Sequence, residues 1–409
     1  MKKIVWTINS IFPDAAEKLG VSLGEKGHWL YSLFNSIKDE LKNKVSFHII
    51  HFKHGLKEQQ IFQKDEVTYY LLPLKTYSYL NNYKNELKSL KGIITSIKPD
   101  LVHIHGTEDA YGLITKEIDI PVIISIQGIR NEIIKYYFSD IKKKEYVKII
   151  LKYRDWSMLK NLLSWKIKTK HEREIIKANN YFIGRTFFDQ ACIKAMNPSA
   201  NYLTGEDHRI IRSEFYQSDW KLENSDKYRI HTTLSESPYK GIFLLLSSIE
   251  IIKQIYPEIQ VYIAGTFKGA IGKEVKYQIR KKKLNNNFCF LGRCNADQLI
   301  NSMLKSRLFV LPSFIDNSPN SLQEAQILGM PVVASYTGGI PSLVEEHHTG
   351  LLFPRGDEKY LSLQIIRLIE DDNLAYLLGK NSKEYRITRN NPEKLKSNYI
   401  LLYNRFLQH

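Results

Sequence analysis

Short apolar stretches alternate with longer amphipathic stretches along most of the chain. The short stretches have the length of β-strands, and the longer ones repeat apolar residues at helical spacing. In the first half, the predicted strands are Lys3–Ile8, Val45–His51, Val67–Leu72, Leu101–His105, Val122–Ile126 and Tyr181–Gly184, and the predicted helices are Trp29–Leu41 and Lys84–Ile97. This order predicts βα units on a parallel sheet and therefore an α/β fold.

A second series of the same kind follows in the other half of the chain. Its predicted strands are Arg229–Thr233, Ile259–Ala264, Phe288–Leu291, Leu308–Leu311 and Val332–Ser335, and its predicted helices are Lys240–Ile255, Glu358–Leu378 and Glu393–Leu407. A chain of 409 residues is also too long for one ordinary core, so we expect two domains.

The two predicted domains are doubly wound and Rossmann-like. We place the N-terminal domain at 1–219, a polar linker at 220–228 and the C-terminal domain at 229–390. The last helix, within 391–409, carries Tyr, Leu and Phe residues that need a surface, and we expect it to pack back on the N-terminal domain.

One stretch of the N-terminal domain, 132–177, differs in character because Lys and Arg alternate there with Tyr, Trp, Leu and Ile. At helical spacing this pattern predicts one or two basic amphipathic helices. Two interpretations remain open. The helices could pack on the sheet and expose a solvated basic face, or they could rest on the anionic headgroups of a membrane.

The chain has 59 Lys and Arg residues against 43 Asp and Glu residues, which gives a formal net charge of +16. Such an excess favours anionic partners, namely nucleic acid, an anionic membrane or a phosphorylated substrate. A lysine-rich proteome would give the same composition. The sequence has no RNP-type aromatic sheet, C2H2 spacing or basic heptad helix, so we do not expect nucleic acid as a partner.

The sequence does not predict a membrane-spanning or secreted protein. No apolar run approaches the roughly 20 residues that cross a bilayer. Thr7 and Asn9 interrupt the apolar start where a signal peptide would need a continuous core. Cys192, Cys289 and Cys294 do not make a disulfide framework or a zinc cluster. We therefore expect a cytoplasmic protein, either free or at the inner face of the cytoplasmic membrane.

The most informative stretch is 311–354, which reads as strand, loop, helix, strand and glycine turn. Ser318 is predicted to cap the helix, with Pro319 at its first position and Gly329 at its end. A helix N-terminus at the end of a parallel strand is a site for an anion, and a diphosphate is the anion we expect. The predicted donor-binding residues at this helix start are Ser318, Asn320, Ser321 and Leu322.

Two acidic residues flank this helix start. Glu324 lies far enough into the helix for its carboxylate to accept hydrogen bonds from the vicinal hydroxyls of a ribose. Asp316 precedes it by eight residues, so the two acids would mark opposite ends of one ligand, with the diphosphate between them. No D-x-D pair follows a predicted strand, so we expect no metal ion at the diphosphate. Positive helix ends and Lys240 would hold it instead.

These residues resemble the donor-binding signature of the family-4 retaining glycosyltransferases of GT-B fold, the group 1 glycosyl transferases. The matching positions are Asp316 and Glu324 at their spacing, Gly329-x-Pro331 with the apolar residues after it, and Gly338-Gly339-x-Pro341. The resemblance implies two Rossmann-like domains that face each other across a cleft. It also implies that Glu324 contacts ribose and that Asp316 lies beside the transferred sugar.

Other segments extend the resemblance. Lys240 matches the basic residue of the family's phosphate site and would neutralise the leaving diphosphate. Many members carry an arginine five or six residues earlier, where this chain has Ser235 and Leu234, so a second cation would have to come from Arg293. Gly27 matches the glycine of the loop where donor and acceptor approach the family's N-terminal domain.

The N-terminal domain contributes two further candidates. His105 ends a predicted strand that matches the family's strand running into the cleft, and Gln127 stands where many members have a histidine. His103 and His105 lie on one face of their strand. A buried structural role, a metal pair and, for His105, contact with substrate all remain open. Gln127 cannot act as a base, but it can hydrogen-bond a sugar hydroxyl.

The resemblance therefore implies a retaining, hexosyl-type glycosyltransferase that needs no cofactor. It would move a sugar from a nucleotide diphosphate sugar to a glycan or lipid-linked acceptor, in surface polysaccharide synthesis and with peripheral contact to an anionic membrane. Two alternatives remain: another GT-B enzyme, such as a nucleotide-sugar epimerase, and a non-catalytic carbohydrate-binding relative.

Overall fold

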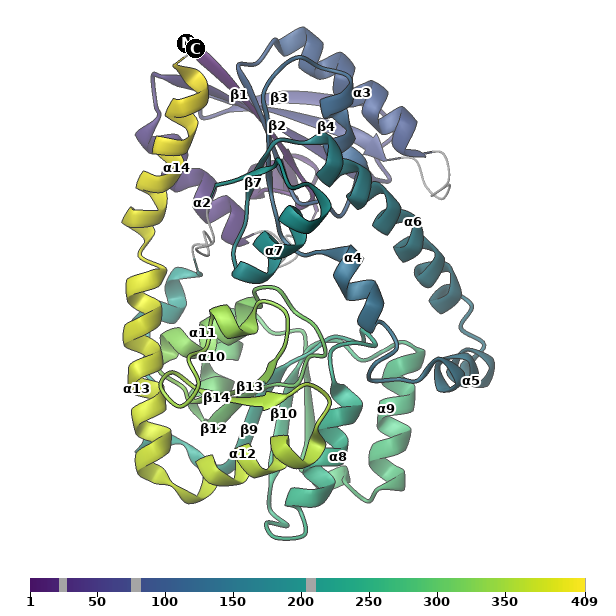
Figure 1. Ribbon diagram of the computed structural model, residues 1–409, viewed down its shortest axis with the longest axis vertical. Helices are drawn as coiled ribbons and strands as arrows, with labels where there is room; N and C mark the ends of the chain where they lie inside the picture. Colours follow the sequence, from purple (N-terminus) through teal and green to yellow (C-terminus); the bar gives the residue numbers. More distant parts are fainter. Residues whose placement is uncertain (22–27, 75–81, 204–210, 409) are drawn as a thin grey trace. The chain divides into compact units, whose positions relative to one another are not determined.

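The computed structural model describes residues 1–21, 28–74, 82–203 and 211–408, and it divides into two compact units (Figure 1). The first unit combines Met1–Asn131, Leu163–Ile210 and Asn390–His409, and the second combines Glu132–Leu162 and Ile211–Arg389. The chain therefore passes between the units more than once, and neither unit is one continuous half of the sequence.

The first unit is built on a sheet in which the described strands number eight, in the order β3-β4-β2-β1-β5-β6-β7-β8. These strands are β1 (Lys2–Ile8), β2 (Val45–His54), β3 (Gln60–Lys64), β4 (Val67–Leu74), β5 (Leu101–His105), β6 (Val122–Ser125), β7 (Tyr181–Ile183) and β8 (Asn201–Tyr202). β3 is antiparallel to β4, whereas the other neighbours run parallel. The six predicted strands are present, and β3 and β8 are additions that the sequence pattern did not indicate.

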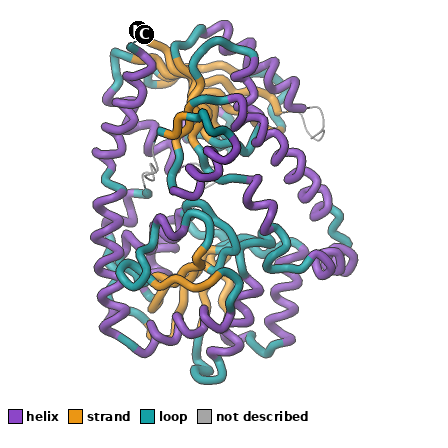
Figure 2. Tube along the Cα trace, viewed as in Figure 1, coloured by secondary structure: helices purple, strands orange, loops and turns teal. Residues whose placement is uncertain are grey.

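Both faces of this sheet are buried. Alternate residues of β1 enter different cores, because Ile4 and Trp6 join one apolar cluster and Val5 joins the other. Helices flank the strands on both sides (Figure 2). The helices of this unit are α1 (Pro13–Lys18), α2 (His28–Glu40), α3 (Asn82–Ile97), α7 (Phe187–Met196), α14 (Pro392–Leu407) and most of α6 (Ser157–Ala178). Burial on both faces is typical of parallel sheets in α/β folds.

The C-terminal helix α14 packs against α2 in the first unit. Its Tyr403 is fully buried, and the Tyr403 hydroxyl lies 2.6 Å from His103 Nδ1. The other ring nitrogen of His103 lies 2.7 Å from the Ser125 hydroxyl. Burial lowers the pKa of His103 to about 3. His103 is therefore a neutral, hydrogen-bonded residue that ties α14 to β5 and β6.

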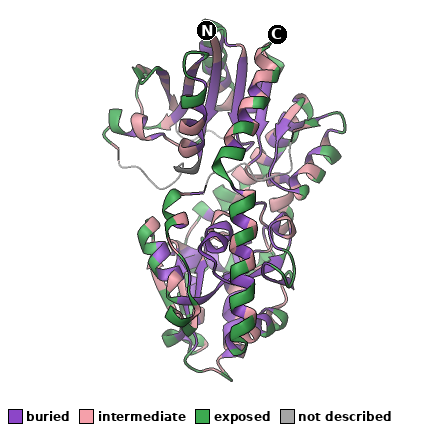
Figure 3. Cartoon of the chain, turned by 90° about the vertical axis from the view of Figure 1, so that its left-hand side faces the viewer, coloured by how far each residue is buried: buried purple, intermediate pink, exposed green. Residues whose placement is uncertain are grey.

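The second unit is built on a parallel sheet in which the described strands number six, in the order β11-β10-β9-β12-β13-β14. These strands are β9 (Asp226–Thr233), β10 (Gln260–Ala264), β11 (Phe288–Gly292), β12 (Ser306–Leu311), β13 (Val332–Tyr336) and β14 (Leu351–Pro354). β14 was not predicted. Figure 3 shows buried residues concentrated in the strands and on one side of many helices, as an amphipathic layer requires.

The helices of the second unit differ from the sequence prediction at one place. They are α5 (Lys143–Tyr153), α8 (Ile242–Ile252), α9 (Ala270–Lys281), α10 (Ala296–Leu304), α11 (Asn320–Leu328), α12 (Glu358–Glu370) and α13 (Asp372–Arg389). The single helix predicted over Glu358–Leu378 is broken at Asp371, which has extended backbone angles of φ −107° and ψ 99°. The Asp371 carboxylate accepts a hydrogen bond from the Leu374 N–H, so its short polar side chain starts a new helix.

The predicted linker 220–228 is also not a linker in the structure. Trp220 is buried, its indole N–H donates to the Ser306 carbonyl at 2.8 Å, and its backbone N–H donates to the Leu328 carbonyl at 2.7 Å. β9 already begins at Asp226. The polar composition was misleading because one large apolar side chain is enough to anchor this stretch to the second unit.

The segment Glu132–Leu162 belongs to the second unit, although the sequence placed it in the N-terminal domain. The Asp140 carboxylate accepts hydrogen bonds from the N–H groups of Phe243 and Leu244, at 3.1 and 3.0 Å, in the first turn of α8. The residue at the N-cap of α8 is Gly241, which has no side chain to serve as a cap. Asp140 therefore supplies the missing cap from 103 residues away in sequence.

Candidate functional site

The motif residues of the second unit lie in loops that follow three neighbouring parallel strands, β9, β12 and β13. The Phe314 N–H donates to the Tyr239 carbonyl at 2.8 Å and joins the loop after β9 to the loop after β12. The Gly339 N–H donates to the Asp316 carbonyl at 2.9 Å and joins the loops after β12 and β13. These residues therefore lie together at the carboxyl edge of the sheet, where α/β folds bind ligands.

Two of the loops approach so closely that they require glycine. Gly241 has φ +79°, and a Cβ atom there would lie 2.0 Å from the Pro312 carbonyl oxygen. Gly338 has φ +52°, and its Cβ atom would lie 2.1 Å from the Asp316 carbonyl oxygen. Any other residue would be strained and would push the loops apart. These glycines therefore set the positions of Lys240 and Asp316.

Lys240 and Asp316 form an ion pair, with 2.5 Å between Nζ and Oδ2. The other carboxylate oxygen of Asp316 accepts a hydrogen bond from the Asn317 N–H at 3.1 Å. Burial by itself would lower the pKa of Lys240, but the nearby Asp316 carboxylate outweighs burial and raises this pKa above its usual value. Lys240 therefore remains a cation. The sequence indicated both residues but not their contact.

Helix α11 begins at Asn320, and its start differs from the prediction. Pro319 occupies the N-cap position with φ −68° and ψ 128°, whereas Ser318 accepts a hydrogen bond from the Gln323 side-chain amide at 3.0 Å. Ser318 is therefore not the cap that the sequence suggested. Since proline has no side-chain acceptor, the N-cap residue cannot satisfy the first-turn amides. Gly329, with φ +80°, ends the helix as predicted.

A buried arginine of α13 (Asp372–Arg389) holds α11 in place by hydrogen bonds. Arg386 of α13 is fully buried, and its guanidinium donates to the Gln326 side-chain oxygen at 3.0 and 2.6 Å and to the Leu343 carbonyl at 2.9 Å. These bonds join α11 to α13 and to the turn after β13. The start of α11 is therefore held on a rigid support, as a ligand site requires.

Glu324 lies on α11 and is only 6 % exposed. Its Oε1 accepts two hydrogen bonds from the Arg212 guanidinium, at 2.8 and 3.2 Å from Nη2 and Nε. The aromatic ring of Phe215 lies 4.8 Å from the same guanidinium. Arg212 was missed in the sequence because it lies 112 residues from Glu324 and outside any motif. It places a cation beside Glu324, whereas the positions of the expected arginine before Lys240 are Leu234 and Ser235.

The remaining donor-binding candidates have different outcomes. Asn320 and Ser321 are half-buried in the first turn of α11, and Leu322 is buried. Arg293 is exposed directly after β11, and β10 and β9 lie between β11 and β12 in the sheet order. Gly27 lies outside the described residues.

His105 ends β5 in the first unit and is only 3 % exposed. Its ring packs against Trp6, with 4.2 Å between the ring centroids. Among the described residues, neither ring nitrogen of His105 has a hydrogen-bond partner. Burial, with the nearby His103 and Arg185, holds the pKa of His105 well below its usual value. His105 is therefore a neutral imidazole.

Gln127 lies next to His105 because β5 and β6 are neighbours in the sheet. Its side-chain amide donates to the His105 carbonyl at 3.3 Å. The structure thus brings together the two predicted residues of the first unit, at the carboxyl ends of adjacent parallel strands. Gln127 is half-buried and can reach a hydroxyl group of a ligand at this edge, whereas both ring nitrogens of His105 are buried.

Glu108 is an acid at the same edge that the sequence analysis missed. Gly106 has φ +107°, and a Cβ atom there would lie 2.0 Å from Glu108 Oε2, so glycine allows the carboxyl group to lie against the backbone. Within the described chain, Oε2 is buried without a hydrogen-bond partner. Burial raises the pKa of Glu108 to about 7. The available signal was a glycine directly after a strand with an acid two residues later.

We expect Glu108→Gln to stabilise the protein in a pH-dependent manner. The folded-state pKa of about 7 exceeds the ordinary value of 4.5, so the cost of burying the charged carboxylate grows between these pH values and is complete above them. The variant should raise Tm by on the order of 5 °C near pH 8 and much less near pH 5. Glu117→Gln, at an exposed acid of the same unit, is the control in thermal melts. An equal gain at both pH values would contradict the assignment.

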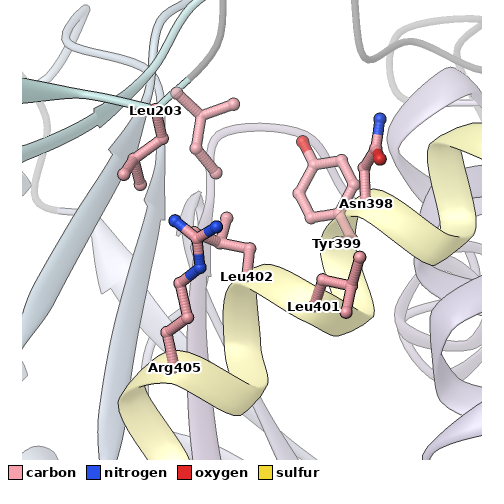
Figure 4. A pocket seen from close by; sticks show the side chains of 7 residues that line it. Leu203, Asn398, Tyr399, Leu401, Leu402 and Arg405 are labelled. Carbon is pink, nitrogen blue, oxygen red and sulfur yellow. The ribbon is translucent and has the colours of Figure 1, made fainter.

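A pocket of about 220 Å³ lies within the first unit, between α14 and the strand region around β7 and β8 (Figure 4). Its lining residues are Ile183, Leu203, Asn398, Tyr399, Leu401, Leu402 and Arg405. None of the residues that the sequence singled out lines this pocket. Within the described residues, no group of three or more His, Cys, Asp and Glu side chains could hold a metal ion, and no helix is long and apolar enough to span a membrane.

The second unit matches a known family. Residues 218–385 match the family model for glycosyl transferases group 1. The chain is 24 % identical to an uncharacterized glycosyltransferase of Methanocaldococcus jannaschii over 83 % of this chain and 85 % of that protein. It is 22 % identical to the N-acetyl-alpha-D-glucosaminyl L-malate synthase of Bacillus anthracis, over 46 % of this chain and 48 % of that one. The second match therefore spans about half of the relative's length.

Solved structures agree over nearly the whole chain. Sucrose-phosphate synthase from Thermosynechococcus elongatus is similar with a TM-score of 0.74, 15 % identity and full coverage of both chains. TarM gives a TM-score of 0.68 at 14 % identity, over 99 % of each chain. The Anabaena protein HepE, solved with UDP and glucose, gives 0.66 at 15 % identity, over 99 % of this chain and 100 % of that one. At such identity the likeness establishes the fold alone.

Proposed function

Because this chain is a glycosyltransferase of group 1 type and GT-B fold, we propose that it transfers a hexose-type unit from a nucleoside diphosphate sugar to a glycan or lipid-linked acceptor. The observation that carries the proposal is the arrangement around the start of α11. Asp316, in the loop that leads to this helix, forms an ion pair with Lys240 of the loop after β9, and Glu324, paired with Arg212, lies about one turn into the helix. One ligand with a charged centre and a hydroxylated group at each end fits this set.

Each residue has a role in the proposal. The first-turn amides of α11 and the Lys240 ammonium would bind the diphosphate, since helix N-termini and buried cations both favour anions. Glu324, oriented by Arg212, would accept hydrogen bonds from the ribose hydroxyls. Asp316 would accept hydrogen bonds from hydroxyls of the transferred sugar. The positive charge for the leaving group would then come from protein groups, and the proposed reaction is independent of a metal ion.

The proposed reaction retains the configuration at the anomeric carbon. The bond between that carbon and the diphosphate oxygen breaks, and a bond from the acceptor hydroxyl oxygen forms on the same face of the sugar. The acceptor proton passes to the departing diphosphate, whose charge Lys240 stabilises most strongly when the bond is broken. Within the first unit, Gln127 would hydrogen-bond a hydroxyl of a bound glycan, and neither Gln127 nor His105 would accept this proton, because an amide is not a base and His105 is buried with a low pKa.

The proposal extends to a role in surface polysaccharide synthesis, with peripheral contact to an anionic membrane. The relatives support such a range: one is named an amylovoran biosynthesis glycosyltransferase of Erwinia amylovora and another a sulfoquinovosyl transferase of Arabidopsis thaliana. The excess of 59 basic over 43 acidic residues suits an anionic surface.

The test is turnover of a panel of UDP, GDP and ADP sugars, with and without glycan and lipid-linked acceptors. We expect transfer or slow donor hydrolysis with one donor class, unaffected by a metal chelator, and a product whose anomeric configuration by NMR equals that of the donor. A free epimer of the donor sugar would identify an epimerase instead. Binding of a donor without any turnover would identify a non-catalytic carbohydrate-binding relative, and an inverted product would contradict retention.

A further inference from the structure

One flank of the second unit exposes apolar side chains that a soluble protein normally buries. Helix α5 packs inward with Tyr146, Ile149 and Ile150, which are at most 5 % exposed. On the opposite side of the same helix, Val147 is 47 % exposed and Leu151, one turn later, is 59 % exposed. Both faces of α5 are therefore apolar, and only one of them has a partner in the described structure.

The turn after α5 and the start of α6 continue this pattern. Trp156 is 57 % exposed and Leu159 is 44 % exposed, whereas Met158 between them is buried. Single exposed apolar residues are ordinary on protein surfaces. Four of them lie within residues 147–159, including a tryptophan, on α5, the turn after it and the start of α6, and this density indicates an interaction surface.

The same stretch is strongly basic. Residues 142–162 contain seven basic side chains and two acidic ones. The basic residues are Lys142, Lys143, Lys144, Lys148, Lys152, Arg154 and Lys160. Of the two acids, Glu145 is paired with Lys148 at 2.7 Å. The local excess of positive charge is therefore much denser than the average over the chain.

Helix α9 extends this surface at the side of α5. Lys152 forms an ion pair with Glu274 at 2.8 Å and lies 3.6 Å from the ring centroid of Tyr277, which is 40 % exposed. The exposed basic residues of α9 are Lys273, Lys276, Arg280 and Lys281. We call the exposed side chains of residues 142–160, together with Tyr277 and the exposed basic residues of α9, the basic-apolar surface.

We propose that the basic-apolar surface binds the headgroup layer of an anionic membrane, with its aliphatic and indole side chains inserted among the upper acyl chains. An apolar stripe flanked by Lys and Arg is the pattern of interfacial helices, and tryptophan favours the boundary between lipid and water. Clusters of basic residues add attraction to anionic lipids. The phosphates of a nucleic acid would pair with the basic side chains but would leave Val147, Leu151 and Leu159 without an apolar partner. Two copies of the surface would repel each other by charge.

This inference deepens the membrane contact of the proposed function and changes its location. The sequence placed the basic segment in the N-terminal domain, but Asp140 and the contacts of Lys152 fasten it to the unit that carries Lys240 and Glu324. The proposed donor-binding unit itself would therefore lie against the membrane.

The test is co-sedimentation of the full-length protein with phosphatidylcholine vesicles that contain or lack phosphatidylglycerol. We expect binding to the anionic vesicles, and at least about tenfold weaker binding to neutral vesicles or in high salt. The triple variant Leu151→Ser, Trp156→Ser and Leu159→Ser should bind the anionic vesicles at least about tenfold more weakly. The matched control makes the same change to serine at Leu363, Tyr376 and Leu377 of α12 and α13. These side chains are 51, 52 and 43 % exposed, and the control should bind like the wild type.

A charge variant separates lipid binding from misfolding. Lys143→Glu, Lys144→Glu and Lys148→Glu are exposed changes that should keep the wild-type Tm but lose vesicle binding. Equal binding by the wild type and both variants would overturn the proposal. It would also be overturned if the wild type is a dimer in sedimentation velocity and the serine variant is a monomer, because the surface would then join two copies. None of these measurements uses a sugar donor, so their outcome is independent of the proposed reaction.

Discussion

Glu324→Ala will remove most of the thermal stabilisation that a nucleoside diphosphate gives this protein. The Glu324 carboxylate is nearly buried and oriented by Arg212, so it can accept hydrogen bonds from both ribose hydroxyls without further ordering. Hydrogen bonds to a charged group contribute about 1.5 to 3 kcal/mol each, so the loss of two of them should lower the affinity at least about 100-fold. Thermal shift at a series of nucleoside diphosphate concentrations measures this loss, because bound ligand stabilises by mass action.

Two further variants define the reason for the loss. Glu384→Ala, at an exposed acid on α13, should keep the full shift. Arg212→Met should weaken binding less than Glu324→Ala, because it removes the residue that orients the carboxylate and leaves the carboxylate itself. A full thermal shift in the Glu324→Ala protein would exclude the ribose assignment.

Lys240→Ala will lower kcat/KM for the sugar donor by about 1000-fold, the scale on which one preorganised charge stabilises a developing anion. The structure keeps Lys240 charged through Asp316 and holds it in place through Gly241. We also expect weaker binding of the nucleoside diphosphate, with a smaller difference from the wild type at high salt, because salt screens the lost attraction. Steady-state kinetics and binding at low and high ionic strength measure both effects.

The controls for Lys240 separate its charge from the ion pair. Lys359→Ala, at an exposed lysine on α12, should leave kcat/KM unchanged. Asp316→Asn removes the carboxylate that holds the pKa of Lys240 high, so it should weaken the contact with the transferred sugar at every pH, whereas the loss of free diphosphate binding should grow as the pH rises. Unchanged turnover in Lys240→Ala would show that the diphosphate leaves without help from this residue.

The sequence was sufficient to predict the elements that depend on local pattern. The strands of both sheets are short apolar runs, because helices bury both of their faces, and such runs are visible without any alignment. Gly338 was visible as a motif residue, and the structure supplies the physical reason for Gly338 and Gly241 in loop contacts near 2 Å. The contact between Lys240 and Asp316 follows from the order of β9 and β12, which a strand list alone does not give.

The features that the sequence did not reveal depend on contacts between distant residues. Arg212 reaches Glu324 across 112 residues, and Asp140 reaches α8 across 103 residues. Neither residue belongs to a periodic pattern, so neither could be assigned a partner from the sequence. Ser318 was expected to cap α11 because serine is a common cap, but Gln323 donates to its hydroxyl instead and Pro319 takes that position. Long-range hydrogen bonds decided the first two cases, and a bond within the helix start decided the third.

The interleaved course of the chain has a practical consequence for engineering. Relatives of this kind invite chimeras in which the first half of one protein is fused to the second half of another, to exchange donor preference. Any such junction near residue 220 would leave Asp140 on the retained half and replace the start of α8 that it caps. A successful exchange must therefore transplant residues 132–162 together with 211–389, as two separate insertions.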